Sequence, residues 1–360
     1  MIYKTIIRPL LFRKDPESSH DMILSMLARL EFFYGTLEEF YKVADPRLSV
    51  KIGTLTFNNP VGLAGGFDKN AVAPKMISGF GFGFMEIGAI TAQAQPGNPK
   101  PRLYRLPEDL ALINRLGFNN EGAQAVALKL DRLRARCGLP KIPLGMNIGR
   151  TKVVETKDAV ADFLACFETL FPHGDFFTLN VSSPNTPNLR DLQEKSLLWE
   201  LVAAVQETNR RLAERARIGP KPVFVKIAPD MEFSQVDEII DVVESTKLSG
   251  IVATNATAFM REKLRSPHGP EPGGLSGRPI TKMVTSFIAH IYRAAGGRLP
   301  IIGVGGIFDA RDAYDKIQAG ASAVQIYTGW IYEGPGAVKR INKGLLRLLE
   351  RDGLKHIAEA

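Results

Sequence analysis

Five asparagines in the sequence are of a residue type that suggests a particular chemistry. Each lies at the end of a β-rich run or in a loop, at positions far apart along the chain: Asn114, Asn147, Asn180, Asn185 and Asn255. An amide side chain offers a donor and an acceptor without charge. Together the five suit a heterocycle whose edge alternates N–H and C=O groups, such as a pyrimidinedione or an isoalloxazine ring. Any one of them alone could be an ordinary turn residue.

Carboxylate-based chemistry has no comparable signal. The sequence contains no HExxH, DxD or Walker pattern, and such patterns hold a catalytic metal or a transferred phosphate. We therefore expect no metal site. The two cysteines, Cys137 and Cys166, are too few for a disulfide framework or a four-ligand zinc site, which favours a reducing compartment.

One lysine lies inside an apolar segment. Lys226, in VFVKIAP, is expected to be buried, where an unpaired ammonium is costly. A flavin would compensate, because its reduced form carries negative charge that a lysine can stabilise. The alternative is the Schiff-base lysine of an aldolase. This residue alone does not separate the two.

Two glycine-rich segments predict a phosphate-binding cradle. They read GVGGI at 303–307 and QIYTG at 325–329, and GGLSGRP precedes them at 273–279. Glycines let backbone N–H groups approach a phosphate closely, and a helix that starts nearby adds positive potential. The phosphate could belong to a substrate or to a flavin. The residues expected in the cradle are Gly277, Gly306, Tyr327 and Thr328.

These residues need a scaffold that brings distant segments together. From about residue 53 the chain alternates nearly continuous apolar runs with amphipathic stretches. The runs lie at 61–65, 84–91, 144–149, 176–182, 223–229, 250–256, 301–306 and 323–328. Eight buried parallel strands, each followed by a helix, predict an α/β fold of the (β/α)8 TIM barrel type. A doubly wound open sheet is the alternative. The polar candidates gather where the runs end, and such barrels place their active sites there.

Residues 1–45 fall outside this alternation and predict an N-terminal helical extension to a barrel at 46–360. Asp15 and Pro16 predict a helix start, and TLEEFYKV predicts a second, short helix. An apolar stripe follows helical spacing: Met22, Ile23, Met26, Leu27, Leu30 and Phe33. The helices could simply pack on the barrel. The alternative is a cap whose apolar face meets an apolar ligand or an anionic membrane surface, because the first 14 residues carry four basic residues and no acid.

Overall charge and hydropathy set further limits. With 46 basic and 38 acidic residues, the net charge is 46 − 38 = +8. Basic clusters at 132–136 and 210–217 lie in helical patterns and are expected to be solvated faces. Aromatic interleaving and groove-reading motifs are absent, so we expect no nucleic-acid partner. No apolar run approaches the ~18 residues of a membrane span, and the start of the sequence lacks the features of a secretory signal.

Longer motifs add a resemblance to a known family. The segments that carry it are LAGGFDKN (63–70), INRLGFNN (113–120), NIGR (147–150), LNVSSPNTPNLR (179–190), VKIAPD (225–230), GGLSGRP (273–279), IIGVGGI (301–307) and QIYTG (325–329). They closely resemble dihydroorotate dehydrogenase over essentially the whole chain, and SSPNTPNLR is highly specific. The helical extension and the serine in that loop resemble the membrane-associated, quinone-dependent class (class 2). The soluble class has a cysteine at this loop position.

The resemblance implies an enzyme with one FMN per chain that oxidises (S)-dihydroorotate to orotate in pyrimidine (UMP) biosynthesis. Ser183 matches the catalytic base, which removes the C5 proton while hydride leaves C6 for flavin N5. The substrate positions match Lys69, Asn114, Arg115, Leu116, Gly117, Phe118, Asn180, Asn185 and Asn255. The FMN positions match Gly65, Gly66, Phe67, Asp68, Lys69, Ala89, Asn147, Asn180, Lys226, Thr254, Gly277, Gly306, Tyr327 and Thr328.

The resemblance also implies an electron acceptor and a location. Electrons pass to a membrane quinone, and His20 and Arg105 match the quinone-side positions. Both are expected to donate hydrogen bonds to the quinone oxygens, with Tyr327 as a third donor beside the flavin. The class implies a monomer held peripherally at the cytoplasmic face of the cell membrane.

Two positions depart from the family pattern. Ala89 stands where the family usually has a threonine near the flavin, so only a backbone contact can remain there. Ala256 replaces the threonine that commonly follows the substrate asparagine, leaving Thr257 one position later. The residues themselves leave two other functions open. One is a phosphate-binding lyase or aldolase that uses Lys226, and the other is a flavin- or nucleotide-binding barrel without turnover.

Overall fold

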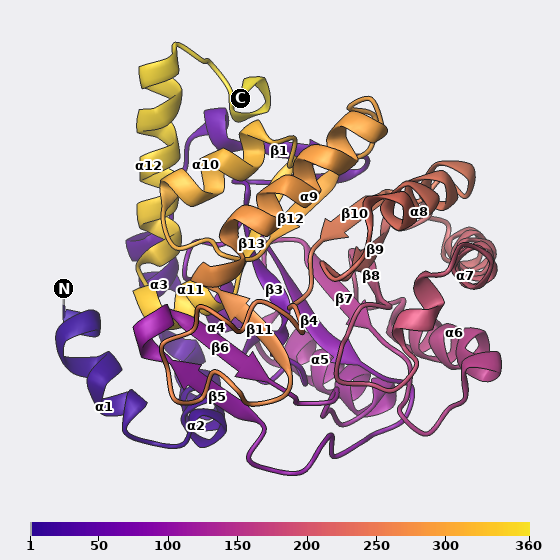
Figure 1. The fold of residues 1–360 in the computed structure, drawn as a ribbon, viewed down its shortest axis with the longest axis horizontal. Helices are drawn as coiled ribbons and strands as arrows, with labels where there is room; N and C mark the ends of the chain where they lie inside the picture. Colours follow the sequence, from indigo (N-terminus) through magenta and orange to yellow (C-terminus); the bar gives the residue numbers. More distant parts are fainter. Residues whose placement is uncertain (1) are drawn as a thin grey trace.

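The computed structural model describes residues 2–360, and its centre is a closed barrel of eight parallel strands (Figure 1). The strands follow one another around the barrel in the order β10-β12-β13-β3-β4-β7-β8-β9. They are β3 (Val61–Asp68), β4 (Phe84–Ile90), β7 (Leu144–Ile148), β8 (Phe176–Asn180), β9 (Val223–Ile227), β10 (Gly250–Ala253), β12 (Ile301–Val304) and β13 (Ala323–Ile326). Every expected run forms a strand of this barrel. The TIM barrel is confirmed, and the open-sheet alternative is wrong.

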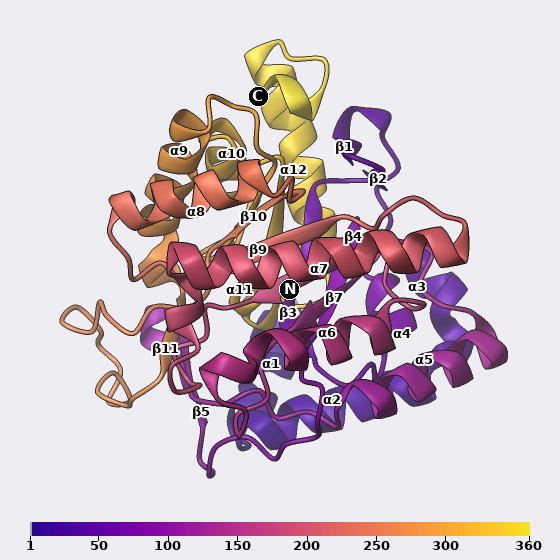
Figure 2. The ribbon, with the colours of Figure 1, turned by 90° about the vertical axis from the view of Figure 1, so that its right-hand side faces the viewer.

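Helices surround the barrel because each strand is followed by an amphipathic segment. The helices after the strands are α4 (Pro74–Ser78), α5 (Ala123–Cys137), α6 (Ala159–Leu170), α7 (Lys195–Ala216), α8 (Phe233–Ser245), α9 (Thr281–Ala294), α10 (Ala310–Gln318), α11 (Thr328–Glu333) and α12 (Ala337–Asp352). Figure 2 shows α5, α6, α7 and α8 side by side on the outside of the barrel. Along α7, Leu198, Leu201 and Val205 are fully buried, whereas Arg210 and Arg211 are exposed. The basic cluster is a solvated face, as expected.

The two ends of the barrel differ. At the amino end, a hairpin of β1 (Val50–Ile52) and β2 (Leu55–Phe57) packs beneath the strands. Its Phe57 ring stacks on Phe84, the first residue of β4, with ring centroids 4.1 Å apart. Phe176, the first residue of β8, lies against both rings. Aromatic side chains therefore close this end, and polar side chains are left to the carboxyl end.

A second sheet covers part of the carboxyl end, and the hydrophobic pattern did not predict it. It consists of three antiparallel strands, β5 (Leu103–Leu106), β6 (Ala111–Asn114) and β11 (Gly274–Gly277), in the order β11-β6-β5. In Figure 1 it lies between the barrel and α2 (Pro16–Arg29). Leu112, in the middle strand β6, is buried. The sheet therefore supplies a wall between the barrel and the N-terminal helices.

The N-terminal segment forms a short π-helix (Tyr3–Ile7), α1 (Arg8–Phe12), α2 and α3 (Tyr34–Tyr41). The predicted start of α2 is confirmed, since Asp15 Oδ1 accepts a hydrogen bond from the Ser18 N–H at 2.8 Å and Pro16 is the first helical residue. The Tyr3 hydroxyl donates to the Ile331 carbonyl at 2.6 Å. These contacts fix the segment against α11.

Short 3₁₀ helices complete the described elements. They lie at Glu31–Phe33, Pro46–Leu48, Pro107–Asp109, Thr156–Asp158, Arg190–Gln193, Arg278–Ile280 and Ile357–Glu359. Among residues 2–360, no helix combines the length and the apolar character needed to cross a membrane.

Candidate active site

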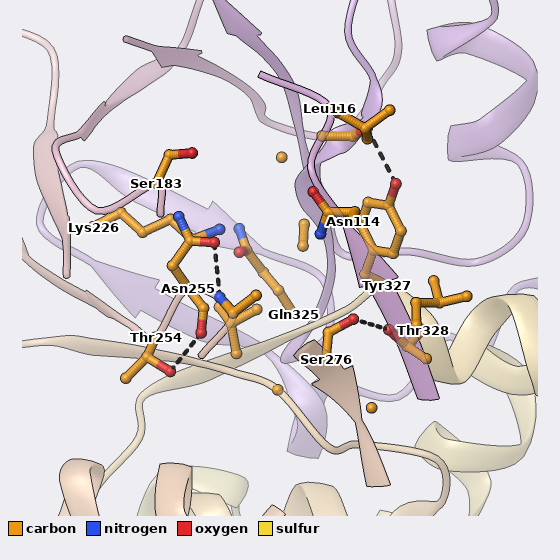
Figure 3. A pocket seen from close by; sticks show the side chains of 18 of the residues that line it. Asn114, Leu116, Ser183, Lys226, Thr254, Asn255, Ser276, Gln325, Tyr327 and Thr328 are labelled. Atoms are coloured by element: carbon orange, nitrogen blue, oxygen red, sulfur yellow. Dashed lines mark hydrogen bonds between the residues drawn. The ribbon is translucent and has the colours of Figure 1, made fainter. Parts of the chain in front are cut away.

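A cavity at the carboxyl end of the barrel gathers most of the polar side chains singled out in the sequence. We call it the polar cavity, and Figure 3 shows it from close by. Its lining includes Gly65, Gly66, Lys69, Ala89, Asn114, Leu116, Gly117, Phe118, Asn180, Ser183, Asn185, Lys226, Thr254, Asn255, Gly277, Gly306, Tyr327 and Thr328. The strands of the barrel and the β5-β6-β11 sheet enclose it from opposite sides. Segments up to about 260 residues apart in sequence therefore meet in one space.

Ser183 follows β8 and lies on the wall of this cavity (Figure 3). Its side chain is 5% exposed, and its Oγ accepts a hydrogen bond from the Asn185 N–H at 3.2 Å. The turn SSPNT brings that N–H back onto the hydroxyl. Because Oγ already accepts from the backbone, its own proton is free to point toward a ligand or a proton acceptor.

The asparagines form two hydrogen-bonded groups. In one, Asn180 Nδ2 donates to Asn147 Oδ1 at 2.9 Å, and Asn255 Nδ2 donates to Ser182 Oγ at 2.9 Å and to Asn180 Oδ1 at 3.4 Å. In the other, Asn185 Nδ2 donates to Asn114 through the backbone carbonyl at 3.1 Å and Oδ1 at 3.3 Å. Amides that hold one another in this way present fixed edges to a ring.

Two lysines give the cavity its positive charge. Lys226, in β9, is 5% exposed, and burial lowers the pKa of its ammonium while the negative charge of Glu86 raises it. Burial lowers the pKa of Lys69, at the end of β3, to about 8, and the carboxylates of Glu17 and Asp21 act against that shift. Neither lysine forms an ion pair with residues 2–360. Both are therefore available to an anionic ligand.

The predicted phosphate cradle lies at one end of the polar cavity. Gly277 has a φ of +105°, and a Cβ on Gly306 would collide with Thr281. Both positions therefore require glycine, and both bring bare backbone to the cavity wall. Thr328 Oγ1 lies 2.9 Å from Ser276 Oγ, a contact visible in Figure 3. Backbone and hydroxyl groups converge here, as a phosphate requires.

Four of the predicted substrate and FMN residues do not line the polar cavity. Arg115 follows Asn114 and points to the other side, where it pairs with Glu271 at 2.8 Å. Asp68 accepts hydrogen bonds from the N–H groups that follow β3, and burial raises its pKa. Phe67 faces a different cavity, and Asn147 lies behind Asn180. Direct ligand contact by these four remains a prediction, without support from the cavity lining.

The structure shows where the two departures from the family pattern, Ala89 and Ala256, lie. Ala89 lines the polar cavity, where its side chain offers no hydrogen bond. Thr257 does not replace the threonine missing at Ala256, because its hydroxyl donates to Asp230 and the side chain is fully buried. Only Ala256 itself reaches the cavity wall.

A second cavity adjoins the first, and we call it the apolar cavity. Its lining is Tyr3, Ile7, Leu11, Phe12, Pro16, Ser19, His20, Ile23, Met26, Leu27, Phe67, Phe80, Leu103, Arg105, Leu112, Tyr327, Trp330, Ile331, Gly334 and Pro335. Leu103, Leu112 and Tyr327 line both cavities. The two spaces are therefore separated by one layer of side chains.

His20 and Arg105 are the polar side chains expected at this second cavity, and both lie in its wall. His20 Nε2 lies 2.7 Å from the Phe67 carbonyl, and burial lowers the pKa of the ring to about 4. Because a carbonyl only accepts, Nε2 carries the proton, and Nδ1 of the neutral ring is an acceptor. Arg105 donates to the Leu11 carbonyl at 3.2 Å and the Lys14 carbonyl at 2.9 Å. It holds the turn between α1 and α2.

Glu86 and Gln325 are among the residues of the site that were missed from the sequence. Glu86 in β4 is fully buried and accepts a hydrogen bond from Asn147 at 2.8 Å. Gln325 in β13 lines the polar cavity and donates to Glu86 at 2.7 Å. The available signal was a single polar residue inside each strand, Glu86 in FMEIGAI and Gln325 in AVQI.

Comparisons with known proteins agree with this arrangement. A family model described as dihydroorotate dehydrogenase matches residues 47–349. The dihydroorotate dehydrogenase (quinone) of Gloeobacter violaceus is 49% identical over 357 residues, covering 99% of this chain and 97% of the relative. The protein of the same name from Anaeromyxobacter dehalogenans is 47% identical over 356 residues, covering 98% and 95%. The crystal structure of the Eimeria tenella enzyme in complex with ferulenol has a TM-score of 0.87 at 39% identity, covering 96% of this chain and 94% of that chain.

Proposed function

The chain belongs to the dihydroorotate dehydrogenase family, and on this premise we propose that it oxidises dihydroorotate to orotate in pyrimidine biosynthesis and passes the electrons to a quinone. It is an oxidoreductase, which excludes the lyase alternative for Lys226. One observation carries the proposal beyond the family name. A polar cavity with a serine and two lysines shares Leu103, Leu112 and Tyr327 with an apolar cavity, so a polar substrate and an apolar acceptor can reach one cofactor.

The family is flavin-dependent, and we propose FMN, with one molecule per chain. The residues present fit it. Gly277 and Gly306 bring bare backbone to the cavity wall where a phosphate would bind, and Lys226 is a buried cation without an ion-pair partner in residues 2–360. Gln325 Oε1 is a buried acceptor that nothing in that range satisfies. When bound, FMN would supply an acceptor for hydride from the substrate and a donor of electrons to the quinone.

Ser183 is the proposed base for the C5 proton. A serine is a poor base at neutral pH, because negative charge on its oxygen is unfavourable. The Asn185 N–H, which donates to Oγ at 3.2 Å, stabilises that charge as the proton transfers. The backbone of the loop therefore contributes to the chemistry directly.

Substrate orientation is assigned to charge and to the amides. A dihydroorotate carboxylate pairs with Lys69, which directly follows β3, through a charge-assisted hydrogen bond. Asn114, Asn180 and Asn255 line the same cavity and read the N–H and C=O groups of the ring. The carboxylate and the ring of the substrate thus meet different groups of the protein, and this difference sets one orientation of the substrate.

The apolar cavity is assigned to the quinone. Its walls accommodate a long apolar tail, and one of its polar side chains, Tyr327, belongs to the shared layer. Tyr327 donates to a quinone oxygen. His20 Nδ1 instead accepts from the hydroxyl of the reduced quinone, because the ring is neutral and Nε2 is engaged. Arg105 orients the α1–α2 turn and retains its Nε–H for the head group.

We further propose that the N-terminal helices rest on an anionic membrane, with the protein monomeric at the cytoplasmic face. The apolar side chains exposed on this segment include Ile6, Leu10, Met22, Met26, Phe32, Phe33 and Phe40. Of the four leading basic residues, Lys4 pairs with Glu333 at 2.6 Å and Arg8 donates to the Tyr332 carbonyl at 3.0 Å. Arg13 and Lys14 remain exposed for anionic headgroups.

The decisive experiment separates the two half-reactions. Purified protein should carry flavin released as FMN, lose its oxidised absorbance on anaerobic mixing with dihydroorotate, and regain it on addition of a quinone. Dihydrouracil is the matched control, since it has the same ring without the carboxylate that Lys69 pairs. A flavin-free protein, or a flavin that dihydroorotate leaves oxidised, would contradict the proposal.

A further inference from the structure

A buried carboxylate lies beneath the polar cavity. Glu86 is fully buried and accepts three side-chain hydrogen bonds: from Asn147 Nδ2 at 2.8 Å, Thr178 Oγ1 at 3.0 Å and Gln325 Nε2 at 2.7 Å. These three donors come from β7, β8 and β13. Glu86 therefore connects strands on both sides of β4 across the inside of the barrel.

A carboxylate only accepts hydrogen bonds, and this property fixes the direction of the amides around it. Asn147 must turn its NH2 group toward Glu86, so its carbonyl faces Asn180 and accepts from Nδ2 at 2.9 Å. Asn180 must then turn its own carbonyl away, toward Asn255 Nδ2 at 3.4 Å and Ser182 Oγ at 3.1 Å. The side-chain orientations of Asn180 and Asn255, which line the cavity, therefore follow from the carboxylate of Glu86, to which Asn147 connects them.

Gln325 shows the same effect on the other side of Glu86. Its Nε2 donates to the carboxylate, and its Oε1 is buried without a hydrogen-bond partner in residues 2–360. Gln325 lines the polar cavity, and Figure 3 shows its side chain between Lys226 and Asn114. A buried acceptor left unsatisfied costs stability, so a ligand N–H is its expected partner.

We propose that Glu86 is a positioning residue that determines which end of Asn180, Asn255 and Gln325 faces the ligands. The inference rests on the proposed function and deepens it. Glu86 does not line the cavity, so it touches neither substrate nor flavin. It acts through Asn147 and Gln325, and the result is one fixed pattern of donors and acceptors rather than several interchangeable ones.

The main test is Glu86→Gln in the FMN-loaded protein, with orotate affinity measured by calorimetry. The new amide has one acceptor where the carboxylate had two, so at least one neighbouring amide must reverse or lose its bond. Orotate binding should weaken about 10- to 100-fold, as expected when buried polar groups lose their partners. Charge alone predicts tighter orotate binding in Glu86→Gln, because removal of a negative charge near an anionic ligand favours binding.

Thr178→Val is the matched control. It removes one donor from the same carboxylate and leaves Glu86 accepting from Asn147 and Gln325, and Thr178 does not line the cavity. The variant should lose thermal stability but bind orotate within about twofold of the original protein. Equal loss of orotate affinity in Thr178→Val and Glu86→Gln would reduce Glu86 to a packing role and overturn the inference.

Gln325→Met covers the case in which Glu86→Gln does not fold. It keeps the buried charge and the Asn147–Asn180–Asn255 chain, and it removes the unsatisfied acceptor together with one donor to Glu86. FMN should dissociate faster from Gln325→Met than from Thr178→Val, because Thr178→Val also loses one donor to Glu86 but keeps the Gln325 acceptor. Unchanged FMN retention would overturn the role of Gln325 and, with it, the inference. Failure of the unmodified protein to bind FMN or orotate would instead reject the proposed function.

Discussion

The polar and the apolar cavity share a wall but are built in different ways. The polar cavity lies at strand ends, where amides, lysines and backbone groups hold one another through hydrogen bonds. The apolar cavity lies between helices, and most of its lining consists of aliphatic and aromatic side chains. Strands of a closed barrel hold side chains in fixed register, whereas packed helices define a volume. The contrast matches two tasks, since removal of a proton and a hydride needs exact geometry and electron delivery needs mainly proximity.

The two cavities also differ in how their polar groups are used. In the polar cavity, Lys69 and Lys226 have no ion-pair partner among the described residues. In the apolar cavity, Arg105 and His20 are already engaged with backbone carbonyls. Ligand binding should therefore depend strongly on single side chains on one side of the wall and weakly on the other. The following predictions test that difference, from the largest expected effect to the smallest.

Ser183→Ala should have the largest effect. The variant keeps the cavity and its FMN but loses the base, so flavin reduction by dihydroorotate should slow by about 10²–10⁴-fold. Stopped-flow absorbance under anaerobic conditions measures this step. Reoxidation of chemically reduced protein by a quinone is the internal control and should be unchanged. An unaltered rate of flavin reduction would eliminate Ser183 as the base.

Lys69→Met should weaken substrate use by about 10- to 100-fold, the effect of one charge-assisted hydrogen bond. The original protein should also show a pH dependence from the same residue. The pKa of Lys69 is lowered to about 8, so its charge is present below pH 8 and is lost as the pH rises above it. kcat/KM for dihydroorotate should therefore fall above pH 8. Lys69→Arg, which stays charged, should remove that decline; a decline that persists in it belongs to another group.

The sequence predicted much of the polar cavity because its determinants are local. Each barrel strand is an apolar run, and Asn180, Ser183 and Asn255 lie at or shortly after the ends of such runs. The β5-β6-β11 sheet was missed because β11 pairs with a strand about 160 residues earlier, which no local pattern records. Arg115 was matched through its motif, yet the alternation of side chains after Asn114 turns it outward to Glu271.

The residues beneath the cavity were missed for a different reason. A nearly continuous apolar run predicts a buried strand, and that reading gives no role to a polar residue within it. Glu86 and Gln325 acquire a role only when the barrel closes and brings β4 and β13 to either side of β3. On the apolar side, the stripe of α2 was predicted, but its division into cavity-lining Leu27 and exposed Met22 depends on tertiary packing.

The double substitution Phe32→Ser with Phe33→Ser should weaken binding to anionic vesicles by about tenfold or more, because each exposed ring contributes apolar area at a membrane surface. The two side chains are 92% and 54% exposed. Sedimentation with vesicles measures the change, and flavin reduction by dihydroorotate should be unaffected. Trp199→Ser is the matched control, since Trp199 is 53% exposed on α7, away from the N-terminal segment. An equal loss in both variants would show that general surface apolarity, rather than this segment, binds the vesicle.

Tyr327→Phe should have the smallest effect and bears directly on the shared wall. The ring separates the two cavities, and within residues 2–360 its hydroxyl makes only a long contact, 3.4 Å, with the Gly66 carbonyl. Burial raises the pKa of the hydroxyl to about 12, so it is a neutral donor across the working range. Loss of one neutral hydrogen bond should slow quinone reduction by about two- to tenfold. Flavin reduction by dihydroorotate should keep its rate, because Ser183 and Lys69 are untouched. A change of equal size in both half-reactions would mean that Tyr327 shapes the flavin site rather than the quinone side. The assignment of one half-reaction to each cavity would then be wrong.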